Sequence, residues 1–283
     1  MSFRFQPLDF APPAEDTPQR AWLLVADAHV QSSGISLERF REMLRWIEGT
    51  EYDVVFLGDV MDLWVGVPRL QEPHHREFLE WCRREKSRRR ILFLEGNHEF
   101  FVAAHQGDAF TACAEDGIAL GDCLLAHGDM AAAPRGHRIF RWWSKSALAH
   151  VLLKWMPFAG CVVNLLKRCL ERHGRKRKPF FPAAAFTAWA KALLASTPQR
   201  IVLVGHFHHA FRTPLANRAL AAALPAWKDR GEVALYEPQT GALLFQCWRN
   251  LPASPETLRS FVPFRSSHVV RETTPAKPHK KTH

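Results

Sequence analysis

The side chains of this chain that could perform chemistry gather in five short clusters, and each cluster follows an apolar run. Asp27-Ala-His29 and Gly58-Asp59-Val-Met-Asp62 supply carboxylates and an imidazole, and the other three clusters add an amide and further imidazoles. Those three are Gly96-Asn97-His98-Glu99, His127-Gly-Asp129 and Gly205-His206-Phe-His208. Carboxylate, imidazole and amide groups without thiolates suit borderline first-row metals such as Mn, Fe or Zn. The clusters therefore predict a metal site.

The number of candidate ligands indicates two metal ions. The ligands are Asp27, His29, Asp59, Asn97, His127, His206 and His208. This set is too large for one ion and sufficient for two, provided that one carboxylate bridges them. Two cations about 3.5–4 Å apart can bind a phosphate, lower the pKa of a bridging water and stabilise both oxygens of an in-line displacement. Any single cluster would be an ordinary helix cap or packed histidine, but packing gives no reason for five in succession.

The elements that must position these clusters follow from the apolar patterns. Buried strands are expected over residues 21–26, 53–57, 90–95, 123–126 and 201–204. Helices are expected over 37–47, with Ser36 as the N-cap, over 74–86 and over 184–196, and a hairpin over 233–236 and 243–248. Alternating strands and helices predict an α/β sheet with antiparallel strands at its edges. All five clusters would then lie at carboxyl ends of strands, where such sheets bind ligands.

Length and composition fit one globular domain with an insertion. The chain has 283 residues, of which 47% are hydrophobic and 23% charged, which excludes a mainly disordered, collagen-like or coiled-coil protein. We expect an N-terminal extension over 1–20 without a secretory signal, the domain over 21–264 and a mobile basic tail over 265–283. A segment at about 135–181 breaks the strand–helix alternation and is predicted to be a helical insertion that caps the active edge.

Charge and cysteine content restrict the partners and the compartment. The 38 Lys and Arg residues exceed the 28 Asp and Glu residues, giving a net charge of +10 that favours anionic partners. The 6 cysteines form no Cys-x-x-Cys pair, which is typical of reduced thiols in the cytosol. The longest uncharged apolar stretch, 155–166, is shorter than the roughly 20 residues of a spanning helix. The insertion is therefore either an interfacial or lid segment, or a buried helix followed by a solvated basic turn.

Taken together, the five clusters resemble the calcineurin-like metallophosphoesterases over roughly residues 21–211. The resemblance implies a four-layer sandwich of two mixed β-sheets flanked by helices. It implies Asp27, His29, Asp59 and His208 as ligands of one metal, and Asp59, Asn97, His127 and His206 as ligands of the other. Asp59 would bridge the two. It also implies that His98 binds the phosphate and protonates the leaving group beside Asn97, with the Asp62 carboxylate as its orienting partner.

Within that superfamily, the chain is most similar to the UDP-2,3-diacylglucosamine hydrolases of lipid A synthesis. The segment from Gly58 to Gly66, including Trp64, matches their motif, and a helical lid lies where the insertion lies here. The resemblance implies two divalent ions, expected to be Mn, and hydrolysis at the α-phosphate to release UMP. It places the protein in the cytoplasm, peripherally on the inner membrane face, because apolar and basic side chains suit a diacyl diphosphate at a bilayer. Trp64, His98, Arg135 and Trp155 are expected to contact the substrate.

The chain departs from the best-known members of that group at three places. His98-Glu99 replaces an Arg-Asp pair, Asp62 replaces a Glu, and an acidic pair is missing from Ala131 to Arg135. The first two changes preserve the metal chemistry, whereas the third leaves the substrate open. The alternatives are a phosphoesterase for soluble nucleotides or nucleic acid, suggested by basic runs at 83–90 and 172–178, and a catalytically silent scaffold. We expect neither nucleic acid nor an obligate protein as the partner.

Overall fold

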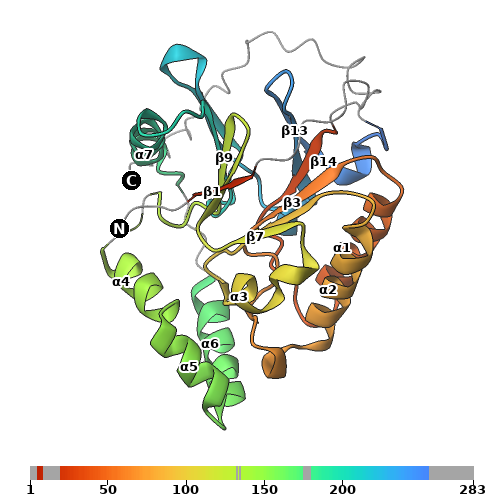
Figure 1. Cartoon of the computed structure of the whole chain (residues 1–283), viewed down its shortest axis with the longest axis vertical. Coiled ribbons are helices and arrows are strands. Elements are labelled where there is room, and N and C mark those ends of the chain that lie inside the picture. The colour runs from red at the N-terminus through yellow and green to blue at the C-terminus, as the bar shows by residue number, and fades with distance from the viewer. Residues whose placement is uncertain (1–4, 9–19, 132, 134, 175–179, 255–283) are drawn as a thin grey trace, which may run out of the picture.

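Two mixed six-stranded sheets face each other at the centre of the protein (Figure 1). The computed structural model describes residues 5–8, 20–131, 133, 135–174 and 180–254. One sheet has the order β14-β13-β2-β3-β5-β7 and the other β1-β8-β9-β10-β12-β11. The first contains β2 (Trp22–Val25), β3 (Asp53–Leu57), β5 (Ile91–Leu94), β7 (Ala112–Ala114), β13 (Glu232–Glu237) and β14 (Ala242–Cys247). The second contains β1 (Phe5–Leu8), β8 (Gly117–Leu120), β9 (Cys123–Ala126), β10 (Ile201–Val204), β11 (Phe211–Pro214) and β12 (Leu220–Ala223).

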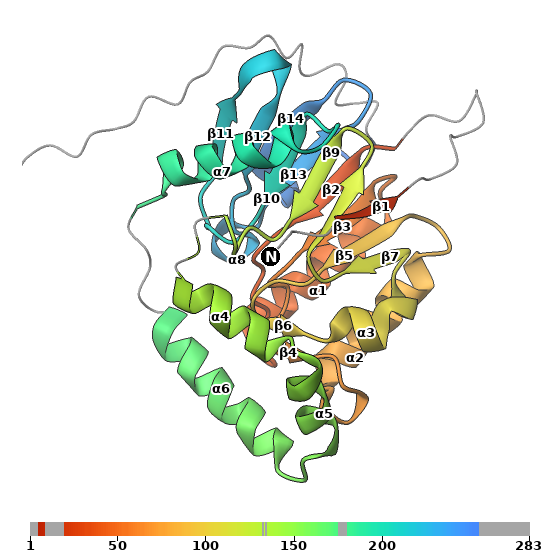
Figure 2. The ribbon, with the colours of Figure 1, turned by 60° about the vertical axis from the view of Figure 1, so that its left-hand side comes forward.

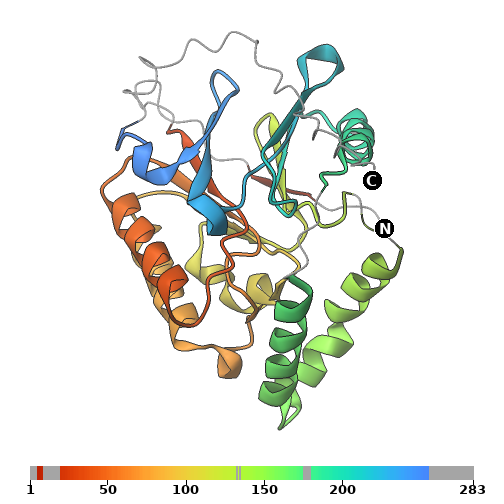
Figure 3. The same ribbon diagram turned by 180° about the vertical axis from the view of Figure 1, so that it is seen from behind.

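Helices cover the outer face of each sheet, as Figure 3 shows from behind. Side chains of α1 (Ile35–Glu48) and α2 (Pro73–Glu85) pack against β2, β3 and β5. On the opposite side, Phe186 and Ala190 of α7 (Ala183–Ala195) pack against β9, β10 and β12. The predicted α/β sandwich of two mixed sheets flanked by helices is thus confirmed.

The core between the sheets explains why the strands have continuous apolar sequences. Leu24, Val55 and Leu92 of one sheet are fully buried in the same cluster as Leu125 and Leu203 of the other. Neighbouring residues in these strands face the helices instead, so both faces are buried. Such strands lack the apolar–polar alternation of a solvated sheet, and this is the pattern from which all five strands were predicted.

The strand order brings the predicted clusters to one edge. Strand β3 pairs in parallel with both β2 and β5, and β10 pairs in parallel with β9. Parallel strands end at the same side of a sheet, so the residues that follow these strands converge. The antiparallel hairpin of β13 and β14 extends the first sheet and confirms the expected antiparallel edge.

One local expectation differs from the structure. Helix α1 begins at Ile35 with Gly34 at the N-cap position, and the Ser36 hydroxyl accepts a hydrogen bond from Gln31 N instead of capping the helix. In the expected N-terminal extension, Phe5–Leu8 form the edge strand β1, parallel to β8. Phe5 packs in the cluster under α7, which supplies the apolar contact that orders this strand. The expected tail at 265–283 lies outside the described residues.

The insertion forms three helices that project from the sheets (Figure 2). They are α4 (Arg135–Ser144), α5 (Ala147–Trp155) and α6 (Ala159–Gly174), followed by α7. Ala149 of α5 is buried against Val65 and Phe100, which belong to the short strands β4 (Trp64–Val65) and β6 (Glu99–Phe100). Two short helices complete the fold, α3 (Val102–Gln106) and α8 (Trp227–Arg230). Among the described residues, no helix is both long and apolar enough to cross a membrane.

Candidate metal centre

The candidate ligands surround the carboxylate of Asp59, which is buried at the end of β3. Asp59 Oδ2 lies 3.4 Å from His127 Nε2 and 3.7 Å from His29 Nε2. These imidazoles come from different sheets, because His29 follows β2 and His127 follows β9. One carboxylate oxygen is thus shared by ligands from both sheets, as a bridging position requires.

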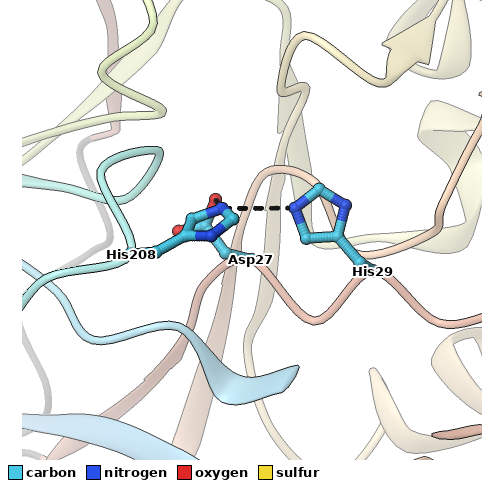
Figure 4. A group of neighbouring side chains, drawn as sticks. All are labelled: Asp27, His29 and His208. Atoms are coloured by element: carbon cyan, nitrogen blue, oxygen red, sulfur yellow. Dashed lines mark hydrogen bonds and ion pairs between the residues drawn. The ribbon is translucent and has the colours of Figure 1, made fainter. Parts of the chain in front are cut away.

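The other candidate ligands form two groups beside this carboxylate. Ligand atoms of Asp27, His29 and His208 lie within 4.8 Å of one another, and so do those of Asp59, His127 and His206. Figure 4 shows the first group, in which His29 Nε2 and His208 Nε2 face each other at 3.3 Å. Asn97 Oδ1 joins the second group at 3.2 Å from His127 Nε2. The structure therefore brings all seven residues together around Asp59, and a third group joins His29 and Asp59 to His98.

The backbone at this edge adopts a conformation that is uncommon for residues with a side chain. Asp27, His29, Asp59, His206 and His208 have φ angles of 52°, 43°, 51°, 68° and 56°. Each left-handed non-glycine residue costs on the order of 1–3 kcal/mol, and such residues concentrate at functional sites. Strain at five candidate ligands supports a functional reason for the arrangement.

Glycines allow the ligand loops to approach one another closely. A Cβ on Gly96 would lie 2.1 Å from Asp59 Oδ1, and one on Gly58 would lie 2.4 Å from His127 Nδ1. Both contacts are far inside van der Waals distance. The glycine positions in these clusters are therefore dictated by packing against the candidate ligands.

Glu99 organises the loop that carries Asp59. Its fully buried carboxylate accepts hydrogen bonds from Asp59 N, Val60 N and Gly96 N, all at 2.7 Å. These bonds join the loop after β3 to the loop after β5. Burial and the nearby Asp59 carboxylate nevertheless raise the pKa of Glu99 to about 7.

Burial and mutual interactions shift the ionisation of the candidate ligands in opposite directions. Burial by itself would raise the pKa of Asp59, but His127, His98 and His29 hold it well below its usual range. Burial lowers the pKa of His29 to about 3 and that of His206 to about 4. Burial also opposes a charge on His127, yet Asp59, Asp27 and Asp129 raise its pKa to about 10. In the metal-free protein, one proton is thus held between His127 and the carboxylates.

The donor set fits two divalent cations. Asp27 Oδ1 is buried without a hydrogen bond from the described residues and lies 3.4 Å from His208 Nε2. An unsatisfied buried carboxylate oxygen is unfavourable unless a cation or donor pairs with it. Nitrogen and oxygen donors without a thiolate match borderline metals. The chemistry of the residues therefore agrees with a dinuclear site for borderline divalent metals.

His98 lies at the same site and has a defined tautomer. Its Nε2 is 3.9 Å from Asp59 Oδ2, and its Nδ1 lies 2.5 Å from the backbone oxygen of Asp62. A carbonyl can only accept, so Nδ1 carries the hydrogen and Nε2 faces the ligand cluster. The sequence indicated the Asp62 carboxylate as the orienting group, and the structure corrects this to its backbone carbonyl. Asp62 Oδ1 instead lies 3.9 Å from His29 Nδ1.

The other residues that were expected to contact the substrate differ in their exposure to solvent. Trp64 is fully buried, stacks on His75 at 5.3 Å and donates from Nε1 to Gln71 Oε1, so the structure gives it a packing role in place of substrate contact. Trp155 is 74% exposed at the end of α5, with the Lys154 ammonium 5.7 Å from its ring centre. Arg135 begins α4, and its side chain lies outside the described part of the structure.

Sequence reasoning missed one cation near the cluster. Lys228 N, at the start of α8, donates to the Asp27 carbonyl at 3.3 Å. Burial lowers the pKa of the Lys228 ammonium, although Asp27, Asp229 and Asp59 act in the opposite sense. No motif surrounds this residue. The packing of α8 against the end of β2 brings its charge to the site, through the bond from Trp227 N to the Ala26 carbonyl.

The family model of the calcineurin-like phosphoesterases matches residues 22–210, and the chain belongs to that family. The matched range contains every candidate ligand. Together with the site described above, the family match identifies the protein as a metal-dependent phosphoesterase.

Among individual proteins, the chain is 23% identical to a UDP-2,3-diacylglucosamine hydrolase from Shewanella loihica. That comparison covers 77% of this chain and 93% of the relative. Solved structures with lower identity are also similar. A Thermus thermophilus protein is 12% identical with a TM-score of 0.45, covering 81% of this chain and 99% of its own. A dimetal phosphatase from Danio rerio is 14% identical with a TM-score of 0.39, covering 82% and 100%.

We predict that metal binding releases about one proton between about pH 7 and pH 9. His127, with a pKa of about 10, is protonated over this range, whereas His29 and His206 are already neutral. A metal competes with the His127 proton, so its affinity rises with pH up to about 10. Calorimetric titration of the apo protein with Mn²⁺ in buffers of different ionisation enthalpy measures the release. An enthalpy that does not depend on the buffer would contradict the prediction.

Gly96→Ala should weaken Mn²⁺ binding by at least about tenfold. The new Cβ would lie 2.1 Å from Asp59 Oδ1 and 2.5 Å from Asp59 N, so the carboxylate must move. The matched control is Gly160→Ala in α6, where no heavy atom lies within 4 Å of the added Cβ. Titration of both variants with Mn²⁺ checks the difference. Equal affinities would show that the close approach of Gly96 to Asp59 does not matter for the metal.

Proposed function

We propose that the protein hydrolyses the diphosphate of UDP-2,3-diacylglucosamine at the α-phosphate, giving UMP and 2,3-diacylglucosamine 1-phosphate. The observation that carries this proposal is the position of the insertion beside the candidate ligands. Asn97 and Phe100 line a small hollow together with Phe140, Arg141 and Ser144 of α4 and with Lys145. Apolar and basic side chains next to a candidate metal ligand suit a phosphate ester with a lipid portion.

The insertion also exposes an unusual number of large apolar side chains. Leu148, Val151, Leu152 and Trp155 of α5 are 62%, 52%, 43% and 74% exposed, and Phe158 is 70% exposed. Water-exposed apolar patches of this kind mark interaction surfaces. Together with Lys154, they suit the interface of an anionic bilayer. We therefore place the protein on the cytoplasmic side, in peripheral contact with the inner membrane face.

The similarity to the Shewanella loihica hydrolase supports the same substrate. The match extends over 93% of that protein and 77% of this chain, so the similarity is not confined to one motif. The chain resembles the diacylglucosamine hydrolases in its segment from Gly58 to Gly66 as well. In the structure Trp64 of that segment is buried, so its contribution is to hold β4 beside the site.

In the proposed reaction, Asp27, His29, Asp59 and His208 would hold one metal, expected to be Mn²⁺. Asp59, Asn97, His127 and His206 would hold the other. When bound, the pair supplies an activated water and stabilises charge on the phosphate. Asp59 keeps its negative charge at all physiological pH values because the surrounding imidazoles lower its pKa. Glu99 holds the Asp59 loop in place through three backbone hydrogen bonds at 2.7 Å.

His98 and Lys228 act on the substrate in this proposal. The hydrogen bond from Nδ1 to Asp62 O fixes the His98 ring so that Nε2 faces the candidate ligands. When the ring is doubly protonated, Nε2 also carries a hydrogen, which it can donate to the leaving oxygen. The Lys228 ammonium, next to Asp27, is a point charge suited to a phosphate oxygen.

The contacts of the arginines at 83–90 argue against the alternative of a nucleic-acid substrate. Arg83 pairs with Asp108, Arg84 with Glu48, and Arg90 with Asp53. Arg88 and Arg89 both pair with Glu85. Positive charges neutralised by neighbouring acids do not form a surface for a phosphate backbone. The second basic run extends over residues whose side chains lie outside the described part of the structure.

We predict that the Mn²⁺-loaded protein releases UMP from UDP-2,3-diacylglucosamine and that Asp59→Ala lowers the rate by at least about 10³-fold, because the shared carboxylate is lost. Chromatographic detection of UMP measures the reaction. A generic aryl phosphodiester serves as the second substrate. Hydrolysis of the diester without release of UMP would contradict the proposed substrate and leave the phosphoesterase assignment intact.

Replacing Leu152, Trp155 and Phe158 together by serine should slow the reaction on vesicle-bound substrate by at least about tenfold. This corresponds to about 1.4 kcal/mol, less than the burial of one such side chain in an apolar phase. Hydrolysis of the aryl phosphodiester should change by less than about twofold. Ile35→Ser is the matched control, because Ile35 is 80% exposed on α1 in the core domain. Equal losses on both substrates would argue against a lipid-contacting role.

A further inference from the structure

Helix α4 and the turn that follows it place two cations in the catalytic core. Arg141 and Lys145 lie one helical turn apart, and their side chains are only 11% and 5% exposed. Arg141 Nη1 donates to Asp129 Oδ2 at 2.7 Å, and Lys145 Nζ donates to Glu95 Oε2 at 2.7 Å. The two acids are 2% and 1% exposed. The insertion is thus joined to the core by two buried ion pairs.

Each ion pair ends in a different loop of candidate metal ligands. Asp129 follows His127 by two residues, and Glu95 precedes Asn97 by two residues. These two loops meet where Asn97 Oδ1 contacts His127 Nε2 at 3.2 Å. The C-terminal end of α4 and the residue after it therefore contact both loops whose ligands belong to the same group.

Further hydrogen bonds fix the partners of these pairs. Arg141 also donates to Asp116 Oδ1 at 3.1 Å and to the Glu115 carbonyl at 3.2 Å. Glu95 Oε1 accepts from Ala103 N at 2.8 Å. Fully hydrogen-bonded ion pairs define one geometry, because a change in either partner leaves a buried charge without compensation.

Two other described cations of the insertion, Arg138 and Lys154, contact no ligand loop. Arg138, one turn before Arg141 on α4, is exposed and forms no hydrogen bond or ion pair with the described residues. Lys154 is exposed on α5 and lies over the ring of Trp155. Exposed charges of this kind contribute little to structure. Arg138 therefore offers a matched control on the same helix.

We infer that Arg141 and Lys145 are positioning residues for the metal centre. Through Asp129 and Glu95, they hold the His127 and Asn97 loops at the separation that one metal ion requires. The inference rests on the metal centre and is independent of the substrate proposed above. It gives the insertion a second role besides contributing side chains to the hollow beside Asn97.

The test measures Mn²⁺ binding to the apo protein by calorimetry. Arg141→Met and Lys145→Met should each weaken the binding of one Mn²⁺ equivalent by about 10- to 100-fold, the usual effect of losing a residue that supports a ligand. Arg138→Met should leave the affinity within about twofold, because an exposed unpaired cation supports no ligand. Wild-type affinity in both single variants would overturn the inference.

A double variant separates positioning from general stability. Glu95→Gln/Lys145→Met removes both charges of one pair, and the glutamine keeps an oxygen that can accept from Ala103 N. Neutralising both partners usually restores much of the stability lost by removing one. The thermal midpoint in EDTA should therefore recover toward wild type while Mn²⁺ binding stays at least about tenfold weaker. Recovery of the affinity together with the midpoint would show that Lys145 acts only on stability and would overturn its positioning role.

Discussion

The Asp59 carboxylate lies among the imidazoles of His29, His98 and His127 at the end of β3, within 3.4–3.9 Å of each. A buried negative charge in this position must be balanced by positive charge. In the metal-free protein, the proton on His127 supplies part of that balance. The same requirement explains why ligands from both sheets converge on one oxygen, and why the pKa values of neighbouring imidazoles diverge so widely.

Holding these side chains together requires an unfavourable backbone conformation at the ligand residues. Five candidate ligands have left-handed φ angles, and the core between the sheets offsets that cost. Leu24, Val55 and Leu203 are fully buried there, directly before or beside the loops that carry the ligands. Glu99 adds a local restraint, since its carboxylate binds backbone N–H groups of two loops at once. The chemistry thus depends on a rigid sandwich whose apolar interior lies immediately behind it.

Much of the core could be predicted from the sequence, because both faces of the central strands are buried and their apolar runs are uninterrupted. The candidate ligands could be predicted for a related reason: each follows such a run in a short motif. Short strands such as β4 and β6, with two residues each, have no periodicity to detect. The burial of Trp64 and the use of the Asp62 carbonyl in place of its carboxylate depend on tertiary packing. Lys228 has no motif at all and reaches the site only through the position of α8.

The anchoring of α4 by Arg141 and Lys145 divides the insertion into parts that can change at different rates during evolution. Substitutions at Arg141 and Lys145 must respect two buried acids in the core, whereas Leu148, Val151 and Trp155 of α5 are largely solvated. The outer helices can therefore diversify toward new surfaces while the ligand loops stay fixed. A relative with a different outer helix and the same two cations would be expected to keep its metal chemistry and alter what it recognises.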